Sequence, residues 1–452
     1  MKAITDPAIL EAYLTDASNL RGHAEMLFRP RSPEDVAEVV AWCQARAIPL
    51  TVTARRTSTT GAPVPQGGAL LSTELLATVH APDDADGGVL LGEYQSEVER
   101  RGLFFPPDPT SRNECSLGGA IACNASGART FKYGPTRKWV DAVELVTPTG
   151  DIVQVTRATP VPWPVPAWTE PAVKTAAGYF PADNLLDLII GSEGTLGIVT
   201  RARLRLLPLP AHVLALLAYF PTRAAMFTFL ERARGMGPRC IEYFDRHALD
   251  LIRGRVPDVP TADSALFLEI EHDTEEPPLE AWFDALVAVD ALVDDTIVAT
   301  DDAGRARLHA VRHALPAAVN ERIARNGVQK VGTDFAVPVA ALPAMMAAYD
   351  AASGAAGAMP TVCFGHIGDS HLHLNFLPTT PEELAEARRR YLDLARQAVA
   401  LGGTVSAEHG IGRLKKAHLA LMASPELLEG WRALKRAADP NHILGRGVLI
   451  DV

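Results

Sequence analysis

Two stretches of sequence decide the fold. They read PPDPTSRNECSLGGAIACNASGARTFKYGPTR over residues 106–137 and LLDLIIGSEGTLGIVTRARLRLLPLP over residues 185–210. Together with an earlier loop they supply four segments rich in glycine, small residues and hydroxyls, at residues 57–61, 116–127, 132–136 and 191–198. Glycine allows a backbone to approach a ligand closely, and successive free N–H groups form an anion-binding concavity. One such loop is usually an ordinary turn, but four of them, separated by strands, indicate one extended ligand such as a dinucleotide.

Two common nucleotide-binding patterns are missing from the sequence. No G-x-G-x-x-G follows a predicted strand and opens a helix, which disfavours a Rossmann domain, and the G-x-x-x-x-G-K-[ST] pattern of a P-loop does not occur. A dinucleotide must therefore be held by a different fold.

The two quoted stretches resemble the FAD domain of the vanillyl-alcohol oxidase / p-cresol methylhydroxylase (PCMH) superfamily. Within it they are most similar to the branch that contains D-lactate dehydrogenase, the glycolate oxidase flavoprotein subunit and D-2-hydroxyglutarate dehydrogenase, and the resemblance extends over nearly the whole chain. It implies an α+β protein. A PCMH-type FAD-binding domain of two subdomains is expected over residues 1–209, and an α+β substrate (cap) domain with an antiparallel sheet over residues 210–415. A helical C-terminal segment, residues 416–452, is expected to return toward the FAD domain.

The resemblance also implies which residues contact FAD: the pyrophosphate loop, the flavin-lining segments and the adenine side. These are Arg55, Arg56, Thr57, Ser58, Thr59, Gly61, Pro107, Ser116, Gly118, Gly119, Asn124, Gly127, Tyr133, Glu193, Gly194, Gly197 and Ile198. Relatives usually carry glycines before the threonine of this loop, where this chain has Ala54-Arg55-Arg56. Two readings stay open: the arginines pair with phosphates, or they reshape the loop and weaken flavin binding. No His or Cys stands in this loop to bond the flavin, so we expect non-covalent FAD.

Outside these segments, local patterns predict individual elements. Ser32 and Pro33 predict the start of a capped amphipathic helix, and residues 140–155 predict a β-hairpin. The proline-rich residues 159–171 predict a loop. In the middle of the chain, apolar strands (213–220, 265–270) alternate with amphipathic helices (223–234, 279–292), which predicts a sheet with helices on one face.

Histidines are concentrated in the last quarter of the chain. In residues 364–375, FGHIGDSHLHLN, the polar residues His371, His373 and Asn375 alternate with leucines, which predicts a strand with its polar side chains on one face. Buried polar side chains need partners, and a metal or an anion supplies them. In residues 406–412, SAEHGIG, a glycine follows Glu408 and His409, which indicates a turn that projects both side chains into a site. Two imidazoles and a carboxylate are typical of catalytic zinc, with manganese and iron as alternatives.

The same strings resemble the G-H-x-G-D-x-x-x-H-x-N and A-E-H-G-I-G motifs of D-2-hydroxyacid dehydrogenases. The resemblance implies that His366, His373 and Glu408 hold the metal and that His409 is the general base. It further implies that Asn375, Arg312 and Lys330 bind substrate. Relatives usually have Gly-Asn where this chain has Ser370-His371, and we favour packing over a supporting role for His371. Pro316 stands where hydroxyglutarate enzymes usually have a hydroxyl residue, which weakens the expectation of a dicarboxylate substrate.

The implied activity is FAD-dependent oxidation of a small D-2-hydroxy acid, with hydride transfer to flavin N5. D-lactate or glycolate is favoured, and D-2-hydroxyglutarate is the alternative. Two other functions stay open: a metal-independent FAD alcohol or sugar oxidase of the same superfamily, and the flavoprotein subunit of a multi-subunit glycolate oxidase.

Composition restricts partners and location. The net charge of −11 disfavours nucleic acid as a partner. The five cysteines include no C-x-x-C pair, so we expect no iron–sulfur cluster on this chain and an electron acceptor elsewhere: a quinone, an electron-transfer protein or an iron–sulfur partner subunit. The sequence predicts neither a signal peptide nor a membrane span. We expect a cytoplasmic protein, with peripheral association with the inner membrane and a homodimer as open alternatives.

Overall fold

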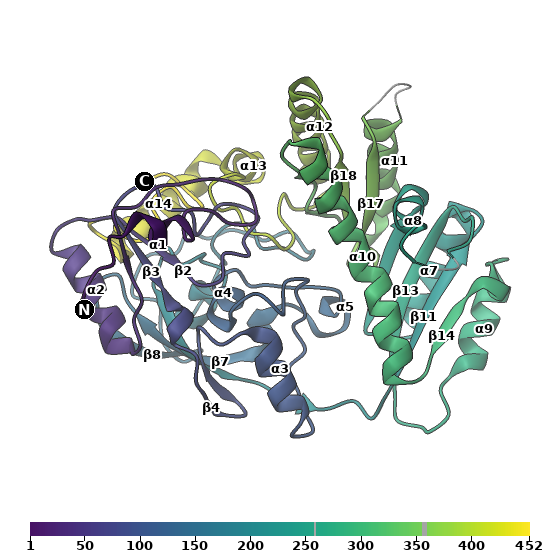
Figure 1. Ribbon diagram of the computed structural model, residues 1–452, viewed down its shortest axis with the longest axis horizontal. Helices are drawn as coiled ribbons and strands as arrows, with labels where there is room; N and C mark the ends of the chain where they lie inside the picture. Colours follow the sequence, from purple (N-terminus) through teal and green to yellow (C-terminus); the bar gives the residue numbers. More distant parts are fainter. Residues whose placement is uncertain (257–258, 355–358) are drawn as a thin grey trace.

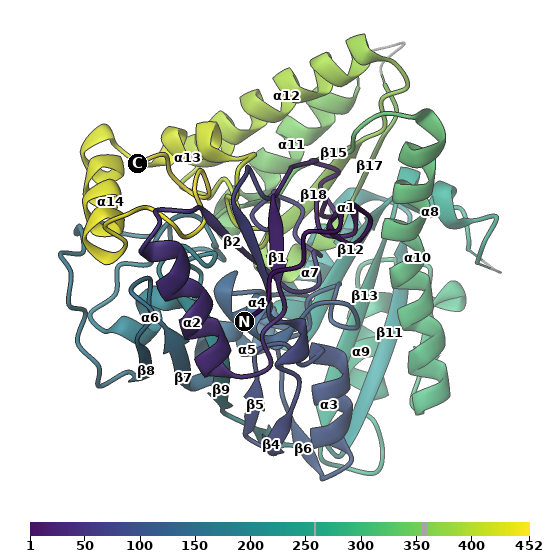
Figure 2. The ribbon, with the colours of Figure 1, turned by 60° about the vertical axis from the view of Figure 1, so that its left-hand side comes forward.

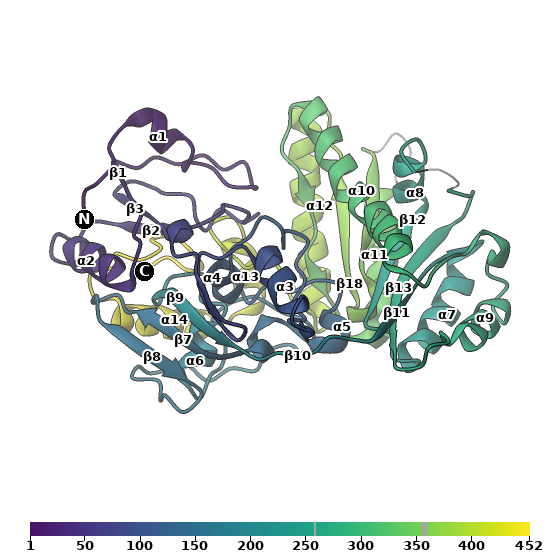
Figure 3. The ribbon, with the colours of Figure 1, turned by 60° about the horizontal axis from the view of Figure 1, so that its bottom comes forward.

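The computed structural model describes residues 1–256, 259–354 and 359–452. Figure 1 shows two lobes: the N-terminal half of the chain and the C-terminal segment share one, and the segments between them form the other. The chain passes between the lobes directly after β10, Leu207–Pro208 (Figure 3).

The first lobe contains two main sheets. A parallel sheet has the order β1-β3-β2, formed by Met26–Phe28, Ala69–Ser72 and Leu50–Thr53. An antiparallel sheet has the order β4-β5-β9-β7-β8, formed by Val79–Ala81, Asp84–Asp86, Ile198–Leu204, Val140–Val146 and Ile152–Thr156. A third, two-stranded pairing joins β6, Leu103–Phe104, to β10. These sheets give the two-subdomain architecture that the sequence predicts.

Local signals in this lobe are confirmed. Helix α2, Pro33–Gln44, begins where Ser32 Oγ accepts a hydrogen bond from the backbone N–H of Asp35, with Pro33 in its first turn. Strands β7 and β8 form the predicted hairpin, and the backbone N–H of Thr147 closes the turn on the carbonyl of Asp151. The remaining helices of this half are short: α1 Pro7–Glu11, α3 Leu91–Glu99, α4 Leu117–Ala122, α5 Thr130–Tyr133 and α6 Leu185–Ile189.

The second lobe is one antiparallel sheet of eight strands, in the order β14-β11-β13-β12-β17-β18-β15, with β16 also paired to β18. Its strands are β11 His212–Phe220, β12 Cys240–Asp245, β13 Ser264–His272, β14 Ile297–Ala299, β15 Val331–Gly332, β16 Phe335–Ala336, β17 Thr361–His366 and β18 His371–Phe376.

The prediction that helices cover one face of this sheet is wrong, because they cover both. Helices α8 and α10, Arg246–Ile252 and Asp302–Asn326, pack on one face. Helices α7, α9, α11 and α12 pack on the other: Arg223–Gly235, Leu279–Val287, Leu342–Ser353 and Pro381–Ala400. The physical reason is visible in β11, where every residue from 213 to 220 is buried and alternate side chains enter opposite cores. A strand that is apolar on both sides needs cover on both sides.

The C-terminal segment returns to the first lobe at α14, Pro425–Ala438 (Figure 2), while α13, Lys416–Met422, still packs on α12 through His418 and Tyr391. The backbone N–H of Leu50 in β2 donates to the carbonyl of Ile443, and Lys435 Nζ donates to the carbonyl of Thr195. The segment between α12 and α14 therefore crosses from one lobe to the other, and it carries Glu408 and His409. Among the described residues, no helix is both long and apolar enough to cross a membrane.

Candidate metal centre and flavin site

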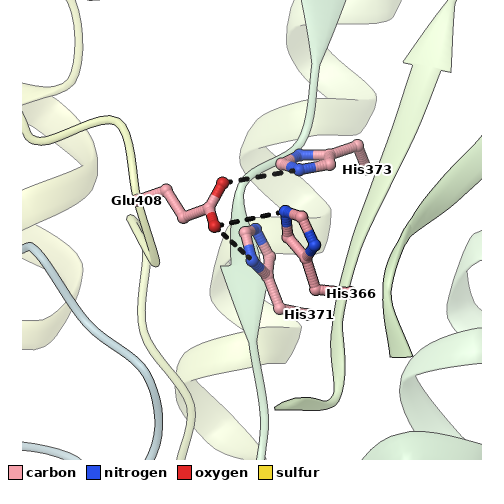
Figure 4. A group of neighbouring side chains, drawn as sticks. All are labelled: His366, His371, His373 and Glu408. Carbon is pink, nitrogen blue, oxygen red and sulfur yellow. Dashed lines mark ion pairs between the residues drawn. The ribbon is translucent and has the colours of Figure 1, made fainter. Parts of the chain in front are cut away.

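The predicted polar face of residues 371–375 is confirmed and opens onto a cluster of ligating side chains. Strands β17 and β18 pair so that His366 lies opposite His371 and Phe364 opposite His373. Glu408 approaches from the segment after α12, and Figure 4 shows its carboxylate directed at the three imidazoles. Each of these four residues offers one ligand atom within 4.8 Å of the others.

The orientation of two imidazoles is fixed by acceptors behind them. His366 Nδ1 lies 2.5 Å from Glu242 Oε1, and His373 Nδ1 lies 2.8 Å from the carbonyl oxygen of Thr333. Their Nε2 atoms face Glu408 at 3.2 and 4.0 Å. A metal-ligating histidine almost always gives its second ring nitrogen to such an acceptor. The donor set and its outer contacts therefore fit a divalent metal ion held by His366, His373 and Glu408.

His371 is fully buried, in agreement with a packing role, but it also belongs to the cluster. Its Nδ1 lies 4.0 Å from Glu408 Oε1, and its Nε2 lies 3.0 Å from Asp334 Oδ1. The ring is thus placed between two carboxylates.

His409 differs from the other three imidazoles in its access to solvent. Its side chain is 33% exposed, against 2%, 0% and 14% for His366, His371 and His373. Its ring stacks on His373, with centroids 5.5 Å apart and planes at 16°. Although part of the side chain is exposed, desolvation by the surrounding protein atoms lowers the pKa of His409 to about 4, so the imidazole is neutral near pH 7 and can accept a proton.

Sequence reasoning missed three charged residues of this site. Lys174 is the first: its ammonium contacts Glu408 Oε1, lies 3.7 Å from Asp369 and donates to the carbonyl of Gly127. Its side chain is only 3% exposed. A single lysine in an irregular segment carries no local signal, so its role appears only in three dimensions.

Glu242 and Asp334 are the other two. Glu242 lies in β12 and connects His366 to Arg312. Asp334 lies beside β16 and contacts both His371 and His409. Each is an isolated acid in its own stretch of sequence, distant along the chain from the histidines that it contacts.

The three residues predicted to bind substrate differ in their burial and in their partners. Arg312 in α10 lies near the cluster, but Glu242 already pairs with its Nη2 at 2.9 Å, and Thr110 Oγ1 accepts from its Nη1 at 3.3 Å. Asn375 is buried in β18, beside His373 on the same face. Lys330 precedes β15; its side chain is exposed and forms no ion pair with any residue that the structure describes.

Two of the four predicted FAD segments meet the residues that follow Glu408. The backbone N–H of Glu193 donates to the carbonyl of Ala122, which places residues 191–194 beside the end of α4. The Glu193 carboxylate accepts from the backbone N–H groups of Ile411 and Gly412, each at 2.8 Å. Thr60, in the loop at residues 55–61, accepts through its carbonyl from the backbone N–H of Arg413. The loop at 55–61 and the segment at 191–194 therefore meet the same short segment.

One segment predicted to line the flavin contacts the histidine–carboxylate cluster, and one predicted to lie on the adenine side is open to a ligand. Ser126, between Asn124 and Gly127, donates to Glu408 Oε1 at 3.3 Å. Gly194 has φ +72°, and no described atom lies within 4 Å of the place that a Cβ would take, so this edge is open to a ligand. Ser116, Gly118 and Gly119 form the first turn of α4, where Ser116 Oγ caps the helix.

Several other predicted FAD residues make contacts with other parts of the protein. Tyr133 donates its hydroxyl to Glu271 across the lobes, and Ile198 is buried in the core of the first lobe. Arg56 stacks on the ring of Tyr13, with 4.6 Å from its Cζ to the centroid. A Cβ at Gly197 would lie 2.8 Å from Leu145 Cδ1, and the backbone carbonyl of Pro107 accepts from the Gln95 side chain. Arg55, Thr57, Ser58, Thr59 and Gly61 occupy the loop after β2.

Three curated relatives match nearly the whole chain. A D-2-hydroxyglutarate dehydrogenase from Xanthomonas citri pv. viticola is 30% identical over 99% of this chain and 94% of its own. The glycolate oxidase subunit GlcD of Bacillus subtilis is 30% identical over 94% of this chain and 88% of its own. A D-lactate dehydrogenase from Anaerostipes hadrus is 30% identical over 99% of this chain and 94% of its own.

A solved structure of alkyldihydroxyacetonephosphate synthase superposes with a TM-score of 0.72, covering 98% of this chain and 81% of that chain. At 17% identity this similarity shows the fold, and it confirms the expected two-lobed arrangement. Two family descriptions match the sequence itself: an FAD binding domain at residues 24–156, and the C-terminal domain of FAD linked oxidases at residues 209–449. The chain therefore belongs to the FAD-linked oxidases and is an FAD-dependent oxidoreductase.

Proposed function

We propose that this protein oxidises a small D-2-hydroxy acid to the 2-oxo acid, with FAD as hydride acceptor and with the assistance of a divalent metal. The observation that carries the proposal is the set of Nε2 atoms of His366 and His373 that face Glu408, beside a segment predicted to line the flavin. The names of the relatives, which include D-2-hydroxyglutarate dehydrogenase, D-lactate dehydrogenase and glycolate oxidase subunit, support the substrate class.

The residues divide the chemistry between them. When bound, the metal supplies Lewis acidity toward the substrate hydroxyl, and FAD supplies a hydride acceptor. His366, His373 and Glu408 hold the metal, for which the donor set favours zinc, with manganese or iron as alternatives. His409 removes the hydroxyl proton, since its ring is neutral and partly exposed. Asn375, Arg312 and Lys330 bind the substrate.

The substrate favoured within this class is D-lactate or glycolate, and D-2-hydroxyglutarate is the alternative. Pairing of Arg312 with Glu242 supports this order, because part of the guanidinium is already neutralised. Electrons leave the flavin toward a quinone, an electron-transfer protein or an iron–sulfur partner subunit.

A substrate screen tests the proposal. We expect at least one of D-lactate, glycolate, D-2-hydroxyglutarate and D-malate to bleach the flavin absorbance under anaerobic conditions, while L-lactate does not. Active protein should contain near-stoichiometric divalent metal, and chelation should abolish bleaching until zinc or manganese is restored. Activity in metal-free protein would support the metal-independent alcohol or sugar oxidase, and bleaching that needs a second subunit would support a glycolate oxidase flavoprotein subunit.

The flavin itself should be dissociable. We expect acid precipitation to release free FAD into the supernatant, because the loop at residues 55–61 contains no His or Cys that could bond the flavin. The measurement is the flavin absorbance of supernatant and pellet. A yellow pellet, with flavin still attached to the polypeptide, would contradict non-covalent binding.

A further inference from the structure

Asp334 is a buried carboxylate that contacts several residues of the site. It is fully buried, and its two oxygens have different partners. Oδ1 accepts from the backbone N–H of Glu408 at 3.2 Å and lies 3.0 Å from His371 Nε2. A buried carboxylate persists only when such partners compensate its desolvation.

The second oxygen, Oδ2, faces His409. It accepts from the backbone N–H of His409 at 3.0 Å and lies 3.3 Å from the Nδ1 atom of the same residue. Ser406 Oγ and Lys415 Nζ complete its shell, each at 2.7 Å. One oxygen therefore accepts from the main chain of His409 and also lies beside its ring.

We propose that Asp334 is a positioning residue that fixes the ring orientation and tautomer of His409, so that Nε2 is presented to the substrate without a proton. The inference rests on the proposed function, in which His409 is the base. Nothing in the sequence patterns or in the comparisons assigns this role to Asp334.

A neutral imidazole carries one proton, and a negative charge 3.3 Å from Nδ1 stabilises that proton on Nδ1. Nε2 is then the lone-pair nitrogen, and only this nitrogen can act as a base. Stacking on His373 restricts rotation of the ring, so the carboxylate and the stack together define where Nε2 points.

Asp334→Asn tests the role, because an amide can donate to Nδ1 and so favours the opposite tautomer. In a serine protease triad the same replacement lowers kcat about 10⁴-fold for this reason. We expect the rate of flavin reduction to fall about 10²–10⁴-fold, the range of a general base. FAD content, metal content and substrate affinity should stay near wild type. The double variant Asp334→Asn/His409→Asn should be no slower than His409→Asn alone, because residues that act as one unit are not additive.

Asp439 supplies a matched control. It is equally buried, pairs with Lys435 and accepts from the backbone N–H groups of Ile443 and Leu444, but it lies away from the cluster. Asp439→Asn should lower thermal stability and leave the rate of flavin reduction in the folded fraction unchanged. An equal rate loss in both variants would overturn the proposal in favour of a merely structural role, as would additive losses in the double variant.

A measurement on the unchanged protein covers the case in which Asp334→Asn does not fold. In protein labelled with ¹⁵N-histidine, the His409 resonances, assigned by their loss in His409→Asn, should show a protonated Nδ1 and an unprotonated Nε2. A protonated Nε2 would overturn the role of Asp334. This experiment needs no turnover, whereas failure of every D-2-hydroxy acid to bleach the wild-type flavin would count against the proposed function alone.

Discussion

His409→Asn should slow flavin reduction by about 10²–10⁴-fold while the protein still binds FAD, metal and substrate. Asparagine keeps part of the volume and hydrogen bonding of the ring but cannot accept a proton near neutral pH. The loss should appear in the rate of flavin bleaching after rapid mixing, and the dependence of that rate on substrate concentration should be unchanged. Near-normal bleaching would assign the base to another residue, with His371 the next candidate.

The adjacent residue provides the sharpest comparison. Glu408→Gln should weaken metal binding first, because Glu408 is the carboxylate that faces the imidazoles, while His409 is the more exposed residue of the two. His418→Asn is a suitable control: this imidazole packs edge-on against Tyr391, outside the cluster. It should affect neither the metal content nor the bleaching rate.

The parts of this site that follow local rules could be predicted from sequence. The alternation of His371, His373 and Asn375 has the period of a strand, and β18 confirms it. The glycine after Glu408 and His409 has φ +73°, a conformation that glycine adopts readily, so the turn at this point follows from the sequence as well.

The site residues that the sequence did not reveal are positioned by contacts between segments that are distant along the chain. Lys174 contacts Glu408 although 234 residues separate them in the chain, and Glu242 contacts His366 at a separation of 124 residues; neither Lys174 nor Glu242 is marked by a local pattern. The helices on the second face of the eight-stranded sheet were missed for a related reason. The amphipathic pattern of a helix shows that one of its faces is buried, but it does not show against which face of the sheet. Only β11, whose side chains are buried on both sides, shows that both faces of the sheet must be covered by helices.

Family resemblance placed segments more reliably than single side chains. It grouped the glycine-rich loops that meet residues 411–414, yet Tyr133 turns to Glu271 and Ile198 enters the core. A sequence motif constrains the path of the backbone, whereas the direction of a single side chain depends on the residues from other segments that contact it. Their assignment as FAD contacts stays a prediction.

His366→Ala and His373→Ala should each remove the metal and, with it, catalysis. Each change deletes one of the Nε2 atoms that face Glu408. Loss of Lewis-acid stabilisation worth several kcal/mol should lower the rate of flavin reduction on the order of 10³-fold or more. FAD should remain, because its predicted segments lie in the other lobe. Elemental analysis and flavin absorbance of the purified variants measure both expectations.

His371→Asn is the control that separates ligation from packing. It introduces the residue that the family resemblance places at this position, so we expect it to keep the metal at wild-type stoichiometry. Metal loss in His371→Asn together with metal retention in His373→Ala would make His371 the ligand. Loss of FAD from His366→Ala, with a lowered melting temperature, would instead point to a collapsed lobe, because Glu242 would then be a buried carboxylate with Arg312 as its remaining partner.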